Sequence, residues 1–333
     1  MKDKKLTLYD KNKIIELVSN MLKYYDKSKY KKVVIKASHL LMDKVRYSDG
    51  EDITLEADFI EEILFVFNDD GTKSIVRDVY HLLRSIDADL INVSFDNVHI
   101  SGFSFNGLRN VEIDIQKIPN YDISRTNLNG VKVKGTLDGA NVEVTNFTGY
   151  IGDLVLNPQL VQNKSLFCTN INGLTVNGSF DDVNVSCMKT KGHKGEIIIN
   201  PQRVLDKDLW CIDFNNIKLV GNYDENSGTY DDACFEGCRL YGTSFKGCIG
   251  NVVIPLDKLY YDVISLCNFT GVKLTGARNN VDLTSSFYED ENGKKIYLTD
   301  NKDNSEDKEE NNTYKNKSKI RSIFDKIIKI SEK

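Results

Sequence analysis

Seven cysteines and four histidines are the residues of this 333-residue chain that could act as nucleophiles or metal ligands. All the cysteines lie between Cys168 and Cys267, their number is odd, and none forms a Cys-x-x-Cys pair. Zinc sites and redox dithiols are often marked by such pairs, so the pattern favours structural cysteines. We expect Cys238, Cys248 and Cys267 to face inward as small hydrophobic residues. Cys234 is expected to face outward and is the candidate reactive thiol.

No group of acids or histidines in the sequence predicts an active site. The adjacent acids Asp181–Asp182 and Asp231–Asp232 are typical of solvated turns, and the acidic run Ser48–Asp52 has its glycine too early for a calcium loop. Phosphate-loop, nucleotide and nucleophile motifs are missing from the sequence. The histidines are spread along the chain, apart from any paired cysteines: His39, His81, His99 and His193. We therefore expect a non-enzymatic protein without a metal or a cofactor.

A repeat marked by the four prolines must position any binding residue. Each proline follows a short apolar run, and Pro158 and Pro201 are 43 residues apart. The remaining two are Pro119 and Pro255. One interval of the repeat is longer, because it contains the polar insert Asn222–Asp232. Insertions in repeat proteins map to loops on one face, so we expect a surface loop or a partial extra coil there.

A shorter period of five residues runs inside each repeat. In these blocks the first and third residues are mostly apolar, the second and fourth mostly polar, and the fifth is glycine or asparagine: Thr126–Gly130, Thr169–Gly173, Ile212–Asn216 and Cys267–Gly271. Alternation predicts very short strands with one face buried. Glycine and asparagine tolerate positive φ, so the fifth residue is expected to make a turn.

The stretch Ala233-Cys-Phe-Glu-Gly, Cys238-Arg-Leu-Tyr-Gly, Thr243-Ser-Phe-Lys-Gly resembles the pentapeptide-repeat family. The resemblance covers about residues 88–287 and implies a mainly β fold, a right-handed parallel β-helix with four pentapeptides per coil. It predicts coils at 88–107, 164–183, 207–226 and 262–281, the last three stacked on one another. Their inward residues would be Leu90, Phe95, Ile100, Phe105; Leu166, Ile171, Val176; Leu209, Phe214, Leu219; and Ile264, Phe269, Leu274. The proline segments 157–166 and 200–209 depart from this pattern and are predicted to be short corner helices.

The chain outside the repeat divides into three further parts. Residues 1–87 show helical periodicity, and we expect a helical domain that covers the exposed strand edge of the first coil. Its predicted helices span about residues 11–25, 30–45, 55–67 and 72–86. Residues 288–316 read as an acidic and polar linker, and residues 317–333 as a basic amphipathic helix.

The C-terminal helix is the sharpest candidate for a binding site in the sequence. Its apolar stripe consists of Ile320, Ile323, Phe324, Ile327 and Ile328. A stripe of this kind must be buried. It could cap the last coil, pair with a second copy in a homodimer, enter a groove of a protein partner, or lie on an anionic membrane surface.

Charge and segment composition restrict the functions further. The net charge is −5, and no segment resembles a signal peptide or a membrane span, so we expect a cytoplasmic, bacterial-type protein. We predict a protein-binding or structural scaffold. The family resemblance implies one alternative, a DNA mimic that binds a type II topoisomerase. The mild acidity and the outward lysines Lys132, Lys134, Lys218 and Lys273 argue against that alternative. Nucleic acid is not expected as a partner, because the basic and aromatic stretch 23–32 is better explained as a solvated helix junction.

Overall fold

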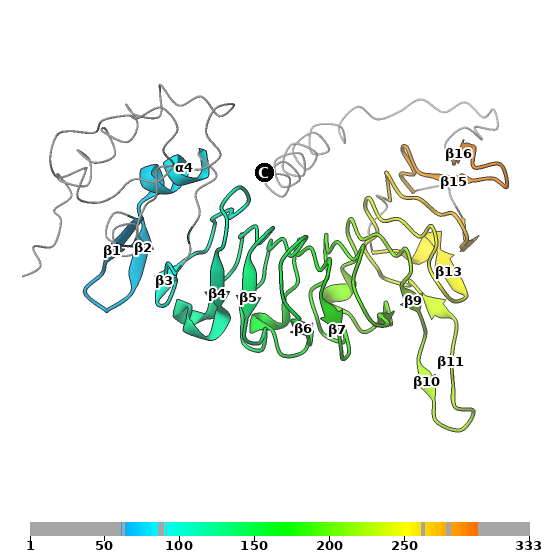
Figure 1. Cartoon of the computed structure of the whole chain (residues 1–333). Coiled ribbons are helices and arrows are strands. Elements are labelled where there is room, and N and C mark those ends of the chain that lie inside the picture. Colours follow the sequence, from blue (N-terminus) through cyan, green and yellow to red (C-terminus); the bar gives the residue numbers. More distant parts are fainter. Residues whose placement is uncertain are drawn as a thin grey trace, which may run out of the picture. The chain divides into compact units, whose positions relative to one another are not determined.

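Two compact units make up the described part of the chain (Figure 1). The computed structural model describes residues 61, 64–85, 90, 92–260, 264–277 and 281–298. Unit 1 contains the chain up to Thr136 together with Gly149–Leu154, and unit 2 contains Leu137–Thr148 and the chain from Val155 onward. The helices predicted at 11–25, 30–45 and 317–333 lie outside the described residues.

Both units are built from coils of a parallel β-solenoid, about eight turns in all. Most strands contain two or three residues and pair in parallel with the next coil, as β4 pairs with β5 and β6 with β7. The prediction of a mainly β parallel solenoid is confirmed. Its strands are β3 (Val98–His99), β4 (Glu112–Asp114), β5 (Lys132–Lys134), β6 (Val155–Leu156), β7 (Thr175–Val176), β8 (Ile198–Ile199), β9 (Lys218–Leu219), β12 (Ala233–Cys234), β13 (Val252–Pro255) and β14 (Lys273–Thr275).

The five-residue rhythm produces the turns that the sequence predicts. The fifth residue of all four blocks has positive φ, from 66° at Asn216 to 89° at Gly173. The polar second residue closes the same turn, since Asn170 Oδ1 accepts a hydrogen bond from the backbone N–H of Asn172 at 3.1 Å. Asparagine can therefore replace a backbone acceptor within the turn.

The core of the coils is a set of stacked side chains. All the predicted inward residues are buried except Leu274, which is half-buried. In unit 2, Phe245 lies between Phe214 and Phe269, with ring centroids 5.3 and 5.8 Å away. Buried threonine hydroxyls bond to the backbone: Thr243 donates to the carbonyl of Leu209 at 2.6 Å, and Thr169 donates to that of Val142 at 2.8 Å. The interior is thus filled by side chains, and these threonines pair their hydroxyls with backbone carbonyls.

Residues with left-handed backbone conformation stack at one corner of unit 2 and show how the coils follow one another. This corner ladder consists of Val144, Cys168, Cys187, Cys211, Gly242, Leu266 and Ser285. The step along the chain is 19 residues from Cys168 to Cys187 and 24 from Cys187 to Cys211. One 43-residue repeat therefore contains two coils. The predicted direct stacking of Leu166 on Leu209 is wrong, because the coil that carries Val185 lies between them.

The corners after Pro158 and Pro201 each contain one three-residue 3-10 segment, so the prediction of a helix that begins at Asn-Pro is wrong there. In the corner after Pro158, Asn163 and Lys164 have φ values of 56° and 48°, which no right-handed helix accommodates. Asn157 caps a turn instead, because its Oδ1 accepts from the N–H of Gln159 at 3.2 Å. The 3-10 segments are η1 (Ile115–Lys117), η2 (Pro119–Tyr121), η3 (Gln162–Lys164), η4 (Leu205–Lys207) and η5 (Leu256–Lys258).

Before the first coil of unit 1, two strands replace parts of the predicted helices. β1 (Phe65–Phe67) and β2 (Lys73–Ile75) form an antiparallel hairpin, and β2 pairs in parallel with β3. Helix α4 (Arg77–Ser85) follows. The predictions of helix over 55–67 and over 72–86 are therefore wrong at these strands. In the described residues a strand, not a helix, covers the edge of β3.

A second hairpin follows the last coil of unit 2. β15 (Phe287–Glu289) pairs with the coil before it through Phe287 and Asn268, and with β16 (Lys295–Tyr297) on its other side. The backbone N–H of Leu298 also donates to Ser286, and the Leu298 side chain is buried. The first residues of the predicted linker 288–316 are thus part of the folded unit, because β15 and β16 pair with each other across a turn.

Candidate interaction site

The polar insert forms a projecting hairpin, which we define as residues 222–232. Its strands β10 (Tyr223–Asp224) and β11 (Thr229–Tyr230) are antiparallel. All of its residues are exposed, while the flanking Gly221 and Ala233 are buried. Figure 1 shows the hairpin extending away from the coils of unit 2. The sequence expectation of a surface loop is confirmed in its position, and the loop has regular strand pairing.

The turn of the projecting hairpin is ordered by its own hydrogen bonds. Asp224 Oδ1 accepts from the N–H of Asn226 at 2.9 Å, and the Asp224 carbonyl accepts from Gly228 at 2.9 Å. Gly228 has a φ of 70°, so a glycine suits this position. The N–H of Asn226 also holds the pKa of Asp224 below its ordinary value. The tip is therefore a shaped turn that carries a carboxylate at neutral pH.

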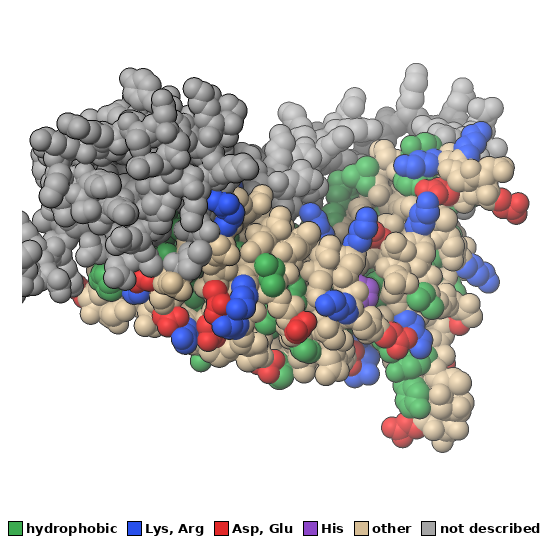
Figure 2. Space-filling view, viewed as in Figure 1, with side chains coloured by type: hydrophobic (Ala, Val, Ile, Leu, Met, Phe, Trp, Pro, Cys, Tyr) green, Lys and Arg blue, Asp and Glu red, His purple; other side chains and the backbone are tan. Residues whose placement is uncertain are grey.

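Two tyrosines face each other across the strands of the hairpin. The ring centroids of Tyr223 and Tyr230 are 5.0 Å apart, and the side chains are 53% and 45% exposed. The ammonium of Lys218, on the adjoining coil, lies 5.8 Å from the Tyr230 ring centroid. Figure 2 shows hydrophobic side chains along the hairpin and an acidic side chain at its outer end. Exposed, rigid aromatic side chains of this kind are the commonest anchors of protein interfaces.

A buried asparagine secures the base of the hairpin to the solenoid. Asn200 Nδ2 donates to the Gly221 carbonyl at 3.0 Å and to Asn222 Oδ1 at 3.3 Å. The strands meet at the same place, since the N–H of Gly221 donates to Asp231 at 2.8 Å. A two-stranded hairpin is only marginally stable by itself, so these hydrogen bonds to the solenoid stabilise its conformation.

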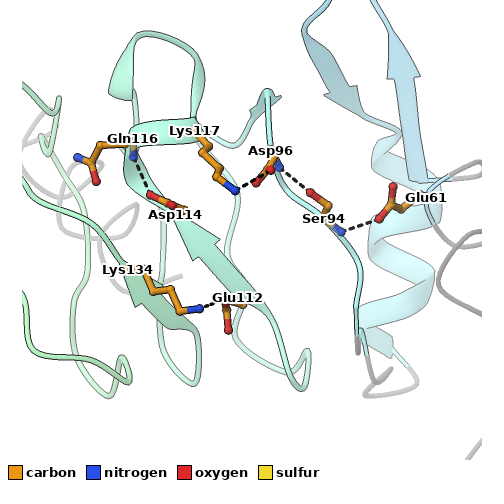
Figure 3. Close-up of polar contacts among 8 residues, drawn as sticks. All are labelled: Glu61, Ser94, Asp96, Glu112, Asp114, Gln116, Lys117 and Lys134. Atoms are coloured by element: carbon orange, nitrogen blue, oxygen red, sulfur yellow. Dashed lines mark hydrogen bonds and ion pairs between the residues drawn. The ribbon is translucent and has the colours of Figure 1, made fainter.

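Ion pairs, most of them between neighbouring coils, balance charge on the solenoid walls. Figure 3 shows two of them in unit 1, where Lys134 approaches Glu112 and Lys117 approaches Asp96. Lys132 also lies 2.8 Å from Glu112, and hydrogen bonds from both lysines lower the pKa of this carboxyl to about 2. Unit 2 has further pairs: Arg203–Asp181, Lys218–Glu196, Arg239–Asp208, Lys246–Glu289 and Lys258–Glu236.

The residues predicted to bind a partner, Ile320, Ile323, Phe324, Ile327 and Ile328, lie outside the described residues. Of the histidines, His99 and His193 each contact a nearby oxygen, at 3.2 Å (Thr72 Oγ1) and 2.6 Å (Thr190 O). His81 is exposed on α4, and His39 is outside the described part. Within that part, no group of three or more histidines, cysteines or acids could hold a metal ion.

The sequence analysis predicted the orientation of four cysteines and did not predict the arrangement of the other three. Cys238 and Cys267 are buried as predicted, Cys248 is half-buried, and Cys234 is exposed as predicted. The fold also brings Cys168, Cys187 and Cys211 together at the corner ladder, which the sequence reading did not foresee. Their spacings of 19 and 24 residues equal the two coil lengths, and this equality is the signal that could have shown it.

No protein-family model matches the chain, and no curated protein matches it either. The likeness to pentapeptide-repeat proteins therefore rests on the repeat itself and on the solenoid. In the described residues, no helix has the length and apolar character to cross a membrane.

Proposed function

We propose that this chain is a non-enzymatic scaffold of the cytoplasm that binds a protein partner through the projecting hairpin. The observation that carries the proposal is the exposed pair Tyr223 and Tyr230, held on an ordered hairpin that stands out from stiff coils. Solenoids suit this role because each coil is braced by its neighbours.

The chemistry of the hairpin indicates the kind of surface that it would bind. Burying two tyrosine rings against an apolar groove is favourable, and the ordered hairpin loses less conformational entropy on binding than a flexible loop would. The same hairpin carries four exposed acidic side chains: Asp224, Glu225, Asp231 and Asp232. The partner surface that fits best is therefore an apolar groove with a rim of lysine or arginine residues.

The charge distribution argues against the alternative of a DNA mimic that binds a type II topoisomerase. A DNA mimic needs an acidic surface, whereas several carboxylates of the coils form ion pairs with lysines or arginines, as Glu112 and Asp181 do. In a supercoiling assay we expect micromolar protein to leave a type II topoisomerase active. Inhibition there would favour the DNA-mimic function instead.

The decisive experiment compares three tagged full-length proteins in affinity purification from the native cell. These are the wild type, the double variant Tyr223→Ser/Tyr230→Ser, and the control Tyr260→Ser, which alters another tyrosine, 58% exposed, in unit 2. We expect one partner to be retained by the wild type and the control and to be lost by the double variant. A photoreactive residue at Asn226 should cross-link to this partner. Equal recovery with all three proteins would refute the hairpin as the docking site.

A further inference from the structure

Three thiols are stacked on consecutive coils of unit 2. Cys168, Cys187 and Cys211 have φ values of 52°, 58° and 53°, so they occupy the same corner position in each coil. The N–H of Cys168 donates to Ser186 at 2.9 Å, and that of Cys187 to Trp210 at 2.6 Å, which keeps the coils in register. Paired strands lie about 4.8 Å apart, and this spacing falls within the range of about 4.4–6.8 Å between the Cα atoms of a disulfide.

The sulfur atoms of this cysteine cluster are in contact. The thiols of Cys168 and Cys211 both hydrogen-bond to the sulfur of Cys187. On the next coil the ladder continues with Gly242, where a Cβ atom would lie 3.0 Å from Cys211 Sγ. Cys168 is 6% exposed, whereas Cys187 and Cys211 are half-buried and within reach of small solutes.

The hydrogen bonds separate the three thiols by acidity. Donation from both neighbours lowers the pKa of Cys187 to about 4, and the ammonium of Lys189 acts in the same direction. The pKa values of Cys168 and Cys211 are raised, chiefly because each donates its proton to Cys187. The carboxylate of Asp208 further raises the pKa of Cys211. The hydrogen bonds therefore favour the thiolate form at Cys187 and the protonated form at its two neighbours.

We propose that this cluster is a peroxide-reactive site in which Cys187 is oxidised first and Cys211 then forms a disulfide with it. Cys211 is chosen over Cys168 because Cys211 is the more exposed of the two neighbours of Cys187. This site is independent of the projecting hairpin, whose contacts do not involve these three residues.

The oxidation proceeds in two balanced steps. The Cys187 thiolate attacks one oxygen of a hydroperoxide; the S–O bond forms, the O–O bond breaks, and the leaving hydroxide or alkoxide takes a proton from water. The Cys211 sulfur then attacks the sulfenic sulfur of Cys187; the S–S bond forms, the S–O bond breaks, and hydroxide leaves as water with the Cys211 proton. The two cysteines lose two electrons in total, and the peroxide is reduced by two.

The test uses the full-length protein and hydrogen peroxide. We expect the intact mass to fall by two hydrogens and peptide mapping to find a Cys187–Cys211 link, also in the control Cys234→Ser. Cys211→Ser should instead accumulate a Cys187 sulfenic acid that dimedone traps. With iodoacetamide at neutral pH, Cys187 should react about tenfold faster than the exposed Cys234. A link to Cys168 would overturn the role of Cys211. Preferential oxidation or labelling of Cys234 would overturn the site.

Discussion

Replacing Phe245 by alanine should remove the central ring of the aromatic stack in unit 2. Phe245 is fully buried, and its ring centroid lies 5.3, 5.2 and 5.8 Å from those of Phe214, Phe235 and Phe269. Truncation of a buried phenylalanine costs about 3–5 kcal/mol in the free energy of unfolding. We expect a value near the upper end, because rings held by separate coils cannot all move in to fill the cavity. The lost ring–ring contacts, worth about 0.5–1.5 kcal/mol per pair beyond burial, are part of this cost and also favour the upper end.

Urea denaturation followed by circular dichroism measures this cost, and hydrogen exchange locates it. The matched control is Tyr223→Ala, which removes an aromatic side chain that is 53% exposed in the same unit. The control should change the free energy of unfolding by no more than about 0.5 kcal/mol. Exchange in Phe245→Ala should accelerate in the coils on either side, since each coil is stabilised by its neighbours. Equal destabilisation by the two substitutions would refute the stacked core.

Two further predictions concern a close backbone approach and an exposed ion pair. Gly250→Ala should destabilise the protein by more than Gly271→Ala, although both glycines have positive φ. A Cβ at Gly250 would lie 2.4 Å from the Leu219 carbonyl oxygen, whereas a Cβ at Gly271 would meet nothing within 4 Å. Left-handed strain alone costs about 1–2 kcal/mol, so thermal unfolding should show at least that for Gly271→Ala, and equal midpoints would contradict the clash. The Glu112 carboxyl has its pKa depressed to about 2, so its ion pairs stabilise the fold above the ordinary pKa of 4.5 and are lost as the pH falls from there to about 2. An NMR titration should find it still ionised at about pH 3 in low salt and shifted upward in high salt; a midpoint near 4.5 at low salt would contradict the pairing.

Most of the local structure of the coils could be predicted from the sequence. The turns at Gly130 and Asn216 and the burial of Phe214 follow from alternation and from residues that tolerate positive φ. The number of coils in each repeat could not be predicted in the same way. The coil that carries Val185 lacks clear five-residue blocks, so a period of 43 residues suggested one coil plus a corner helix where the fold has two coils.

The candidate site was predictable in its position but not in its form. The extra length of one repeat located the insert 222–232, yet nothing periodic in it shows that Tyr223 and Tyr230 lie across a strand pair. That arrangement depends on Asn200, a residue of the preceding coil whose contact is visible only in three dimensions. The prediction of corner helices was wrong for a related reason. Asn-Pro is a favourable helix start, but Asn163 and Lys164 adopt the left-handed conformation, which does not continue a right-handed helix.

The alternation of 19- and 24-residue coils has a consequence for how such a protein can change in length. Duplication or loss of a single coil would bring two short or two long coils together and would displace a proline corner from its neighbours. Duplication or loss of 43 residues would keep short and long coils alternating at both junctions and would preserve the backbone hydrogen bonds between coils. The evolutionary and engineering module of unit 2 is therefore the coil pair, and its successive proline corners rise by about 10 Å, twice the spacing of paired strands.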